Sequence, residues 1–111
     1  MAYSLIITTC ATKEDAKEII NALLGAKLAA CVQTQEIESF YIWKGKAENS
    51  KEVILFIKTK SELYKEAEAA ILSRHKYETP EIVEIPFRNG YPGYLRWIDA
   101  VTKDSSHLQN F

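Results

Sequence analysis

Residues 28–59 constrain the fold of this chain more than any other segment. The polar, glycine-containing segment 44–50 lies between two β-branched and aromatic runs. The first run extends from residues 28–32 to residues 40–43, and the second covers residues 53–59. Such runs on either side of a polar turn predict a β-hairpin. Both arms exceed the usual strand of about five to six residues, so their far ends are expected to project beyond a small sheet. Projecting strands that carry aromatic side chains need a partner, and the hairpin therefore predicts oligomerisation.

Upstream of the hairpin, the pattern predicts a strand and a helix. The apolar run at residues 5–9 predicts a central strand that is buried on both faces. Thr12, with Asp15 three residues later, resembles a capping box. We expect the following helix to end at Gly25 in a left-handed conformation. Its apolar residues recur at helical spacing: Ala16, Ile19, Ile20, Leu23 and Leu24.

Downstream of the hairpin, the pattern predicts a helix, a strand and a short terminal helix. Ser61 is expected to cap a second helix that ends near residues 73–75. Residues 81–85 resemble a fourth strand, which Pro86 ends because proline donates no ladder hydrogen bond. Residues 89–93 are dense in turn formers, and residues 105–111 are predicted to fray. A third helix over residues 94–101 is expected to present one apolar face: Tyr94, Leu95, Ile98 and Val101.

The order strand, helix, strand, strand, helix, strand, helix indicates the fold class. Doubled βαβ units of this kind predict an α+β, ferredoxin-like split βαβ sandwich with an antiparallel sheet and both helices on one face. A chain of 111 residues is expected to form a single domain over residues 1–111. The other face of the sheet needs a cover, which the third helix or formation of a trimer would supply.

Charge and composition exclude several classes of protein. The formal net charge of −1 argues against nucleic-acid binding, which usually requires a clustered basic surplus. No apolar run approaches the ~20 residues that span a bilayer. Cys10 and Cys31 lie far apart, and the N-terminus lacks the features of a secretion signal, so we expect a reducing cytoplasm. No GxSxG elbow or glycine-rich phosphate loop occurs, so no enzymatic activity is expected.

The densest cluster of chemically reactive side chains lies at residues 74–81. His75, with Glu78 three residues later, offers nitrogen and oxygen donors that suit copper or zinc. Two ligands are too few for tight binding, so others would come from elsewhere in the chain or from another subunit. The alternative is that His75 is a histidine at a helix C-terminus, where the helix dipole favours it.

Five motifs together resemble one known family. They are Leu28-Ala29-Ala30-Cys31-Val32, Tyr41-Ile42-Trp43-Lys44-Gly45-Lys46, Glu52 with Lys58-Thr59, His75-Lys76-Tyr77-Glu78-Thr79-Pro80-Glu81, and Tyr94-Leu95-Arg96-Trp97. In this order and spacing they resemble the CutA divalent-cation tolerance proteins, from about residue 4 to residue 102. The resemblance implies a ferredoxin-like subunit in a compact homotrimer, with the hairpin reaching to neighbouring subunits. It also implies tolerance of divalent metal ions, with copper binding in some members and no firmly attached enzymatic activity.

The resemblance also implies a metal site. His75 matches the family histidine, and some copper-binding members add a cysteine at the end of the first strand. That position corresponds to Thr8 here, and Cys10 follows two residues later. A shift of two residues keeps the same face of a strand, so Cys10 substitutes if the strand extends that far. Copper, or zinc or another divalent cation, is therefore expected to bind through His75, Glu78 and Cys10.

An alternative hypothesis comes from the architecture that this family shares with the PII signalling proteins. The chain would then be a trimeric signalling or interaction module that binds a small molecule or protein effector between subunits. Charged and aromatic side chains that converge beside a subunit boundary suit such a ligand. The expected cleft residues are Lys58, Tyr77, Glu81 and Trp97. Neither hypothesis identifies the downstream protein partner.

Overall fold

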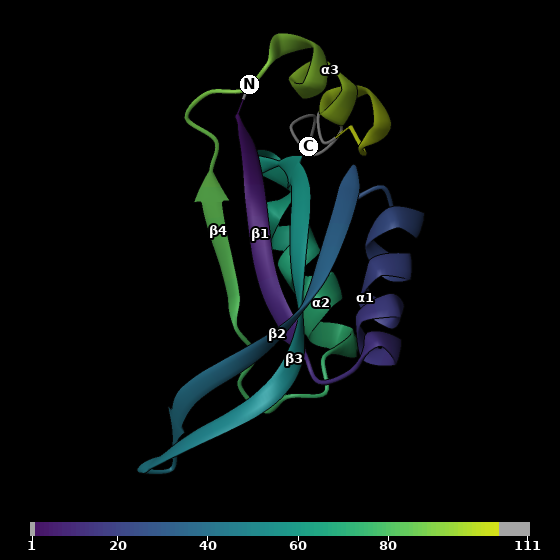
Figure 1. Cartoon of the computed structure of the whole chain (residues 1–111). Helices are drawn as coiled ribbons and strands as arrows, with labels where there is room; N and C mark the ends of the chain where they lie inside the picture. The colour runs from purple at the N-terminus through teal and green to yellow at the C-terminus, as the bar shows by residue number, and fades with distance from the viewer. Residues whose placement is uncertain (1, 105–111) are drawn as a thin grey trace.

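The computed structural model describes residues 2–104 (Figure 1). The described residues form four strands and three α-helices in the predicted order. These are β1 (Tyr3–Cys10), α1 (Lys13–Gly25), β2 (Cys31–Trp43), β3 (Lys46–Lys60), α2 (Tyr64–Arg74), β4 (Ile82–Pro86) and α3 (Pro92–Val101). The predicted tail over residues 105–111 lies outside the described residues. Within residues 2–104, no helix is long and apolar enough to cross a membrane.

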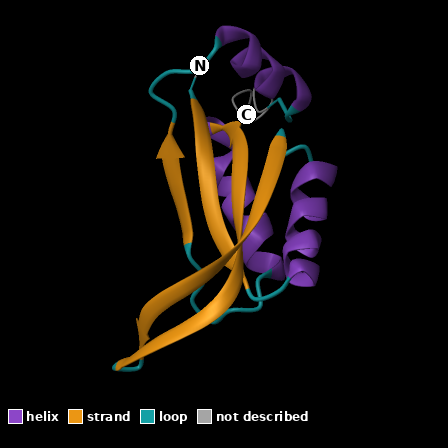
Figure 2. Cartoon of the chain, in the orientation of Figure 1, coloured by secondary structure: helices purple, strands orange, loops and turns teal. Residues whose placement is uncertain are grey.

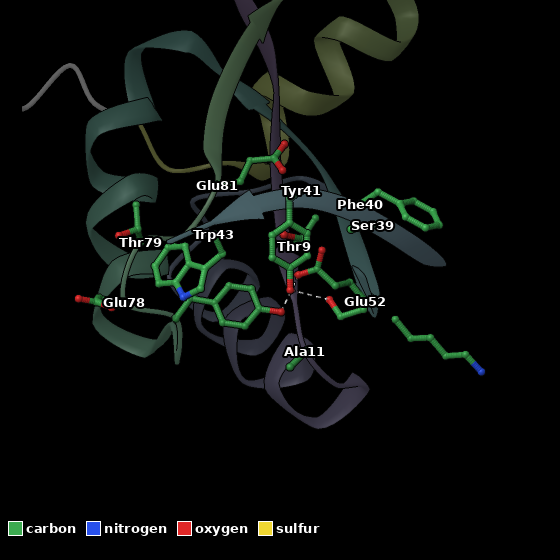
Figure 3. A pocket seen from close by; sticks show the side chains of 13 residues that line it. Thr9, Ala11, Ser39, Phe40, Tyr41, Trp43, Glu52, Glu78, Thr79 and Glu81 are labelled. Atoms are coloured by element: carbon green, nitrogen blue, oxygen red, sulfur yellow. Dashed lines mark hydrogen bonds between the residues drawn. The ribbon is translucent and has the colours of Figure 1, made fainter. Parts of the chain in front are cut away.

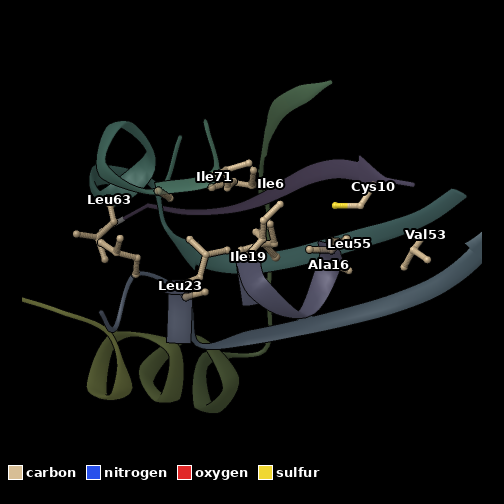
Figure 4. Close-up of a cluster of buried hydrophobic side chains, with 13 residues drawn as sticks. Ile6, Cys10, Ala16, Ile19, Leu23, Val53, Leu55, Leu63 and Ile71 are labelled. Carbon is tan, nitrogen blue, oxygen red and sulfur yellow. The ribbon is translucent and has the colours of Figure 1, made fainter. Parts of the chain in front are cut away.

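The described strands form an antiparallel sheet in the order β2-β3-β1-β4. Helices α1 and α2 cover one face of this sheet (Figure 2), which confirms the α+β, ferredoxin-like class. Alternate residues of β1, such as Ile6 and Cys10, are buried against the helices. The apolar core lies in this layer (Figure 4) and includes Ile6, Ile19, Leu23, Leu55, Leu63 and Ile71.

The opposite face of the sheet is not covered by the described chain. Helix α3 lies at the end of the sheet, where Asp99 pairs with Lys60 at 3.2 Å, and does not lie across it (Figure 1). Leu5 of β1 is consequently half-buried, and Val83 and Ile85 of β4 are 43% and 48% exposed. The expectation that the first strand is buried on both faces is therefore wrong for this chain by itself. An apolar sheet face is left open to a partner.

The hairpin is longer than predicted, because its turn is shorter. Trp43 pairs with Lys46, so Lys44 and Gly45 form the whole turn, and the predicted turn over residues 44–50 is wrong. Lys44 has φ 50° and Gly45 has φ 80°. Positive φ at both central residues is typical of the type I′ turn, whose twist matches that of the flanking strands. Pairing therefore continues to the tip, and the distal hairpin projects past the helices (Figure 1).

The ends of α1 confirm one prediction and correct another. The Thr12 hydroxyl accepts a hydrogen bond from the Asp15 amide at 3.1 Å, which confirms the N-cap. The left-handed residue is Lys27, with φ 57°, and not Gly25, which is the last helical residue. The Leu28 amide donates to the Leu23 carbonyl at 2.8 Å, and Leu28 itself is buried. The reversal therefore occurs two residues later, where it directs Leu28 into the core.

Two further boundaries and the packing of α3 differ from the predictions. Ser61 does not cap α2, because its hydroxyl bonds to that of Ser4 and a 3-10 turn (Ser61–Leu63) precedes the helix. Pro92 starts α3 and is not part of the preceding turn. Proline suits the first turn of a helix because the backbone N–H that it lacks has no acceptor within the helix there. The predicted apolar face of α3 is divided, with Ile98 buried and Tyr94 36% exposed. Strand β4 ends at Pro86 as predicted.

Candidate functional site

The segment between α2 and β4 places the predicted site residues next to the end of β1. His75 is the C-cap of α2, with extended backbone angles of φ −74° and ψ 138°. The chain therefore leaves the helix at this residue. Residues 75–81 then pass the last residues of β1 and border two adjoining sites, which share Ala11 and Tyr77: a tight space that contains Cys10 and His75, and an open cavity at the base of the hairpin.

Both ring nitrogens of His75 have partners within the chain. Nε2 donates to the Thr9 carbonyl at 2.8 Å, and the Tyr77 amide donates to Nδ1 at 3.2 Å. Because a carbonyl only accepts and an amide only donates, these bonds select the neutral imidazole with its proton on Nε2. Burial lowers the pKa of His75, although the Thr9 carbonyl and the carboxylates of Asp15 and Glu52 act in the opposite direction.

Cys10 lies beside His75 but is fully enclosed. Strand β1 extends through Cys10, and Thr8 and Cys10 are buried on the same face. The strand therefore extends far enough for Cys10 to take the place of the family cysteine that corresponds to Thr8. Burial, and then the charges of Asp15 and Glu52, raise the pKa of the Cys10 thiol to about 11. The thiol is therefore protonated at neutral pH, whereas the thiolate is the form that binds metals.

The three predicted metal ligands do not fit a ready-made metal site. The His75 nitrogens are engaged, the Cys10 thiol is buried and protonated, and Glu78 lines the open cavity and not the space that contains Cys10 and His75. Among residues 2–104, no group of three His, Cys, Asp or Glu residues is arranged to hold a metal ion. The structure thus brings His75 and Cys10 together without Glu78, and their role as ligands stays a prediction.

The open cavity has a volume of about 740 Å³ and lies at the base of the hairpin (Figure 3). Strand residues two apart share a face, so Tyr41 and Trp43 project from β2 on the same side. Glu52 on β3 and Glu81 after α2 complete the walls with Tyr77. The cavity therefore joins the hairpin to the segment that follows α2.

A buried carboxylate fixes one wall of this cavity. The Tyr77 hydroxyl donates to Oε2 of Glu52 at 2.6 Å, and Glu52 is only 9% exposed. Burial, and then the hydrogen bond to Glu52, raise the pKa of Tyr77 well above its ordinary range. In the sequence, Glu52 stands out only as part of a motif, and its role in this wall is not predicted. The available signal was a carboxylate directly preceding the apolar run of β3.

Two of the four predicted cleft residues line this cavity. Tyr77 and Glu81 do so, whereas Lys58 and Trp97 lie elsewhere. Lys58 donates to the Gln33 side chain on the sheet. Trp97 stacks on Tyr94 within α3, with ring centroids 5.6 Å apart. A cleft that includes all four residues is not formed by the described chain alone and stays a prediction for an assembly.

Comparison with known proteins places the chain in a family. A profile of the CutA1 divalent ion tolerance protein family matches residues 4–101. The chain is 40% identical over 107 residues to Protein CutA of Mus musculus, covering 96% of this chain and 60% of that protein. It thus spans about three fifths of the mouse protein. It is 39% identical to the divalent-cation tolerance protein CutA of Archaeoglobus fulgidus, covering 91% of this chain and 99% of that protein.

Solved structures agree with this assignment. The periplasmic divalent cation tolerance protein CutA from Archaeoglobus fulgidus superposes with a TM-score of 0.89 at 38% identity, covering 91% of this chain and 99% of that chain. CutA1 from Oryza sativa superposes with a TM-score of 0.90 at 32% identity, covering 95% and 97%. Sequence and fold both agree over nearly the whole described chain, which therefore belongs to the CutA1 family of divalent ion tolerance proteins.

Proposed function

We propose that this chain acts as a homotrimer in the response to divalent metal ions and binds copper or a similar cation. The observation that carries the proposal is the family match over residues 4–101, because that family is described by divalent ion tolerance. The Archaeoglobus fulgidus relative, which the chain spans almost completely, is called a divalent-cation tolerance protein. The family description names a tolerance and no reaction, and the absence of enzymatic activity stays a prediction.

Surface chemistry supports the proposed assembly. The sheet face opposite the helices exposes Val83 and Ile85, and the hairpin tip exposes Phe40 and Ile42 at 74% and 73%. Apolar patches of this kind mark protein–protein contacts in soluble proteins. Association of copies through the sheet face would supply the cover that α3 does not. We further propose a cytoplasmic location, which suits the unpaired cysteines Cys10 and Cys31.

Metal binding through His75 requires a change in the hydrogen bonds described above. An imidazole nitrogen becomes available only if Nε2 leaves the Thr9 carbonyl or Nδ1 leaves the Tyr77 amide. Further ligands would be Cys10, after loss of its proton, Glu78, or groups from a neighbouring subunit. This requirement predicts modest affinity, because the cost of rearrangement is subtracted from the binding free energy.

Native mass spectrometry during a stepwise copper(II) titration tests both parts of the proposal. We expect an intact trimer that saturates at one ion per subunit. His75→Gln should remove the defined stoichiometry, whereas the matched variant His107→Gln, at the other histidine of the sequence, should retain it. An unsaturating series of adducts, or saturation that survives His75→Gln, would contradict binding at His75. A stable monomer at micromolar concentration would contradict the assembly.

A second candidate function is binding of an effector in the manner of a signalling module. The cavity of about 740 Å³, lined by Tyr77 and Glu81, favours it. Metal indifference combined with a metabolite that raises thermal stability would favour this candidate, since a ligand that binds only the folded state stabilises it.

A further inference from the structure

We propose that the cavity at the base of the hairpin binds a small organic cation, an alkylammonium compound held between aromatic rings and carboxylates. This inference goes beyond the proposed divalent-ion function and depends on neither His75 nor Cys10. It rests on three properties of the described cavity: its charge, its aromatic walls and its size.

The charge of the cavity is unbalanced toward the negative. The described residues that line it include three carboxylates, of Glu52, Glu78 and Glu81, and one ammonium, of Lys51. The carboxylate of Glu52 is the most enclosed, at 9% exposure, and is held by the Tyr77 hydroxyl at 2.6 Å. A concave site lined by one sign of charge raises the local concentration of the opposite ion. The cavity therefore attracts cations.

The aromatic walls favour an organic cation. Tyr41, Trp43 and Tyr77 line the cavity, and Figure 3 shows Tyr41, Trp43 and Glu52 projecting into the same space. The Tyr77 hydroxyl is bonded to Glu52, and that of Tyr41 to Ser50 at 3.2 Å, so both rings are oriented before a ligand arrives. Aromatic faces attract ammonium groups, and clustered rings form the cages that recognise alkylated ammonium.

The hairpin already shows this interaction once. The ammonium of Lys44 lies over the Trp43 ring, 5.8 Å from its centroid. The indole therefore stands in a position that a cation can reach. Indole is also the ring that binds cations most strongly. Trp43 is accordingly the residue whose loss should weaken a bound ammonium most.

The size of the cavity favours an organic cation over a bare metal ion as the ligand. Its volume of about 740 Å³ falls within the roughly 300–1,000 Å³ that is typical of small-molecule sites. A bare metal ion would leave most of this space to water. No trio of metal-binding side chains is found within residues 2–104, the cavity walls included. A ligand with alkyl surface and one positive charge uses both the rings and the carboxylates.

Isothermal titration calorimetry on the assembled full chain tests the proposal with a matched pair of probes. Choline carries the ammonium, and 3,3-dimethylbutan-1-ol has the same shape without the charge. We expect choline to bind and the neutral alcohol to bind at least about 10-fold more weakly, because the cation–aromatic attraction is absent. Equal binding of the two probes, or no choline binding up to about 10 mM, a very weak affinity, would overturn the proposal.

Matched variants locate the binding. Trp43→Leu should weaken choline binding about three- to thirty-fold. Tyr91→Leu should leave it unchanged, since Tyr91 is an aromatic residue, 78% exposed, that precedes α3 and lies outside the cavity. Glu81→Gln should weaken binding, and Glu14→Gln, on α1, should not. Native mass spectrometry of each variant confirms that assembly is kept. An equal loss in Tyr91→Leu would overturn the assignment.

The same experiment distinguishes this inference from the metal proposal. Choline binding should persist in His75→Gln, because His75 is not among the described residues that line the cavity, and its hydrogen bonds to two that do, Thr9 and Tyr77, are to backbone groups. Loss of copper binding in His75→Gln with choline binding intact would support both. Loss of both copper and choline binding in His75→Gln would overturn the separation of the two sites.

Discussion

The hydrogen bond between Tyr77 and Glu52 offers the sharpest test of this structure. Tyr77→Phe removes one hydroxyl and leaves the ring in place. The Glu52 carboxylate then loses its donor at 2.6 Å while staying 9% exposed. A buried charged group that loses its partner costs more than a neutral one, because its hydration was given up on folding. We therefore expect a loss of stability much larger than that from a surface hydroxyl.

The magnitude follows from the burial of the pair. Net contributions of hydrogen bonds to charged groups are about 1.5–3 kcal/mol. Because Tyr77 is half-buried and Glu52 is buried, we expect Tyr77→Phe to cost about 2 kcal/mol per subunit. For a domain of this length, that corresponds to a decrease in melting temperature of about 8 °C.

Tyr41→Phe is the matched control. The Tyr41 hydroxyl contacts the Ser50 hydroxyl at 3.2 Å and is exposed, so its loss should cost less than about 0.5 kcal/mol. Urea unfolding of the variants and the parent, at one subunit concentration, measures both costs, since the stability of an oligomer depends on concentration. If Tyr77→Phe costs no more than Tyr41→Phe, the Glu52 carboxylate is solvated, and the described wall of the cavity is wrong.

Three further predictions follow from local geometry. Lys27→Gly should stabilise the protein by about 0.5–1 kcal/mol in urea unfolding, because Lys27 has φ 57°; Gly45→Ala, at φ 80°, should destabilise it. Burial lowers the pKa of His75 in the folded protein below its value of about 6.5 in the unfolded chain. With a chelator present, the free energy of unfolding should therefore fall as the pH drops below about 6.5, because a protonated Nδ1 cannot accept from the Tyr77 amide. His75→Gln should flatten that part of the profile, and an unchanged slope would contradict it. Finally, a thiol reagent at pH 8 should label Cys31 well before Cys10, whose pKa is raised to about 11; equal rates in mass spectrometry would refute this.

The fold was predictable because local and global signals agree along most of the chain. Thr12 caps the helix that its spacing predicts, and Pro86 ends the last strand. Errors occurred where tertiary contacts compete with residue preference. Gly25 has the stronger preference for a left-handed conformation, yet Lys27 adopts it, because the reversal there buries Leu28.

The sites were less predictable, because they depend on where side chains from distant segments meet. The spacing of His75 and Glu78 suggested a shared ion, but the chain turns extended at His75 and places Glu78 at the open cavity. The contact of Tyr77 with Glu52 joins residues 25 apart in the sequence, and no local pattern signals it. Family motifs named both residues without indicating that they touch.

The alternation of side chains in β2 gives the two sides of the hairpin different surfaces. Tyr41 and Trp43 line the cavity on one side of β2, and Phe40 lines it as well, whereas Ile42 is 73% exposed and does not line it. Because successive strand residues point to opposite sides, this four-residue run would supply both the proposed ligand wall and an apolar surface for the proposed neighbouring copy. The type I′ turn at Lys44 keeps the arms paired to the tip, so both surfaces are held rigidly. If copies assemble through the hairpin as proposed, that contact will be coupled to the shape of the cavity at its base.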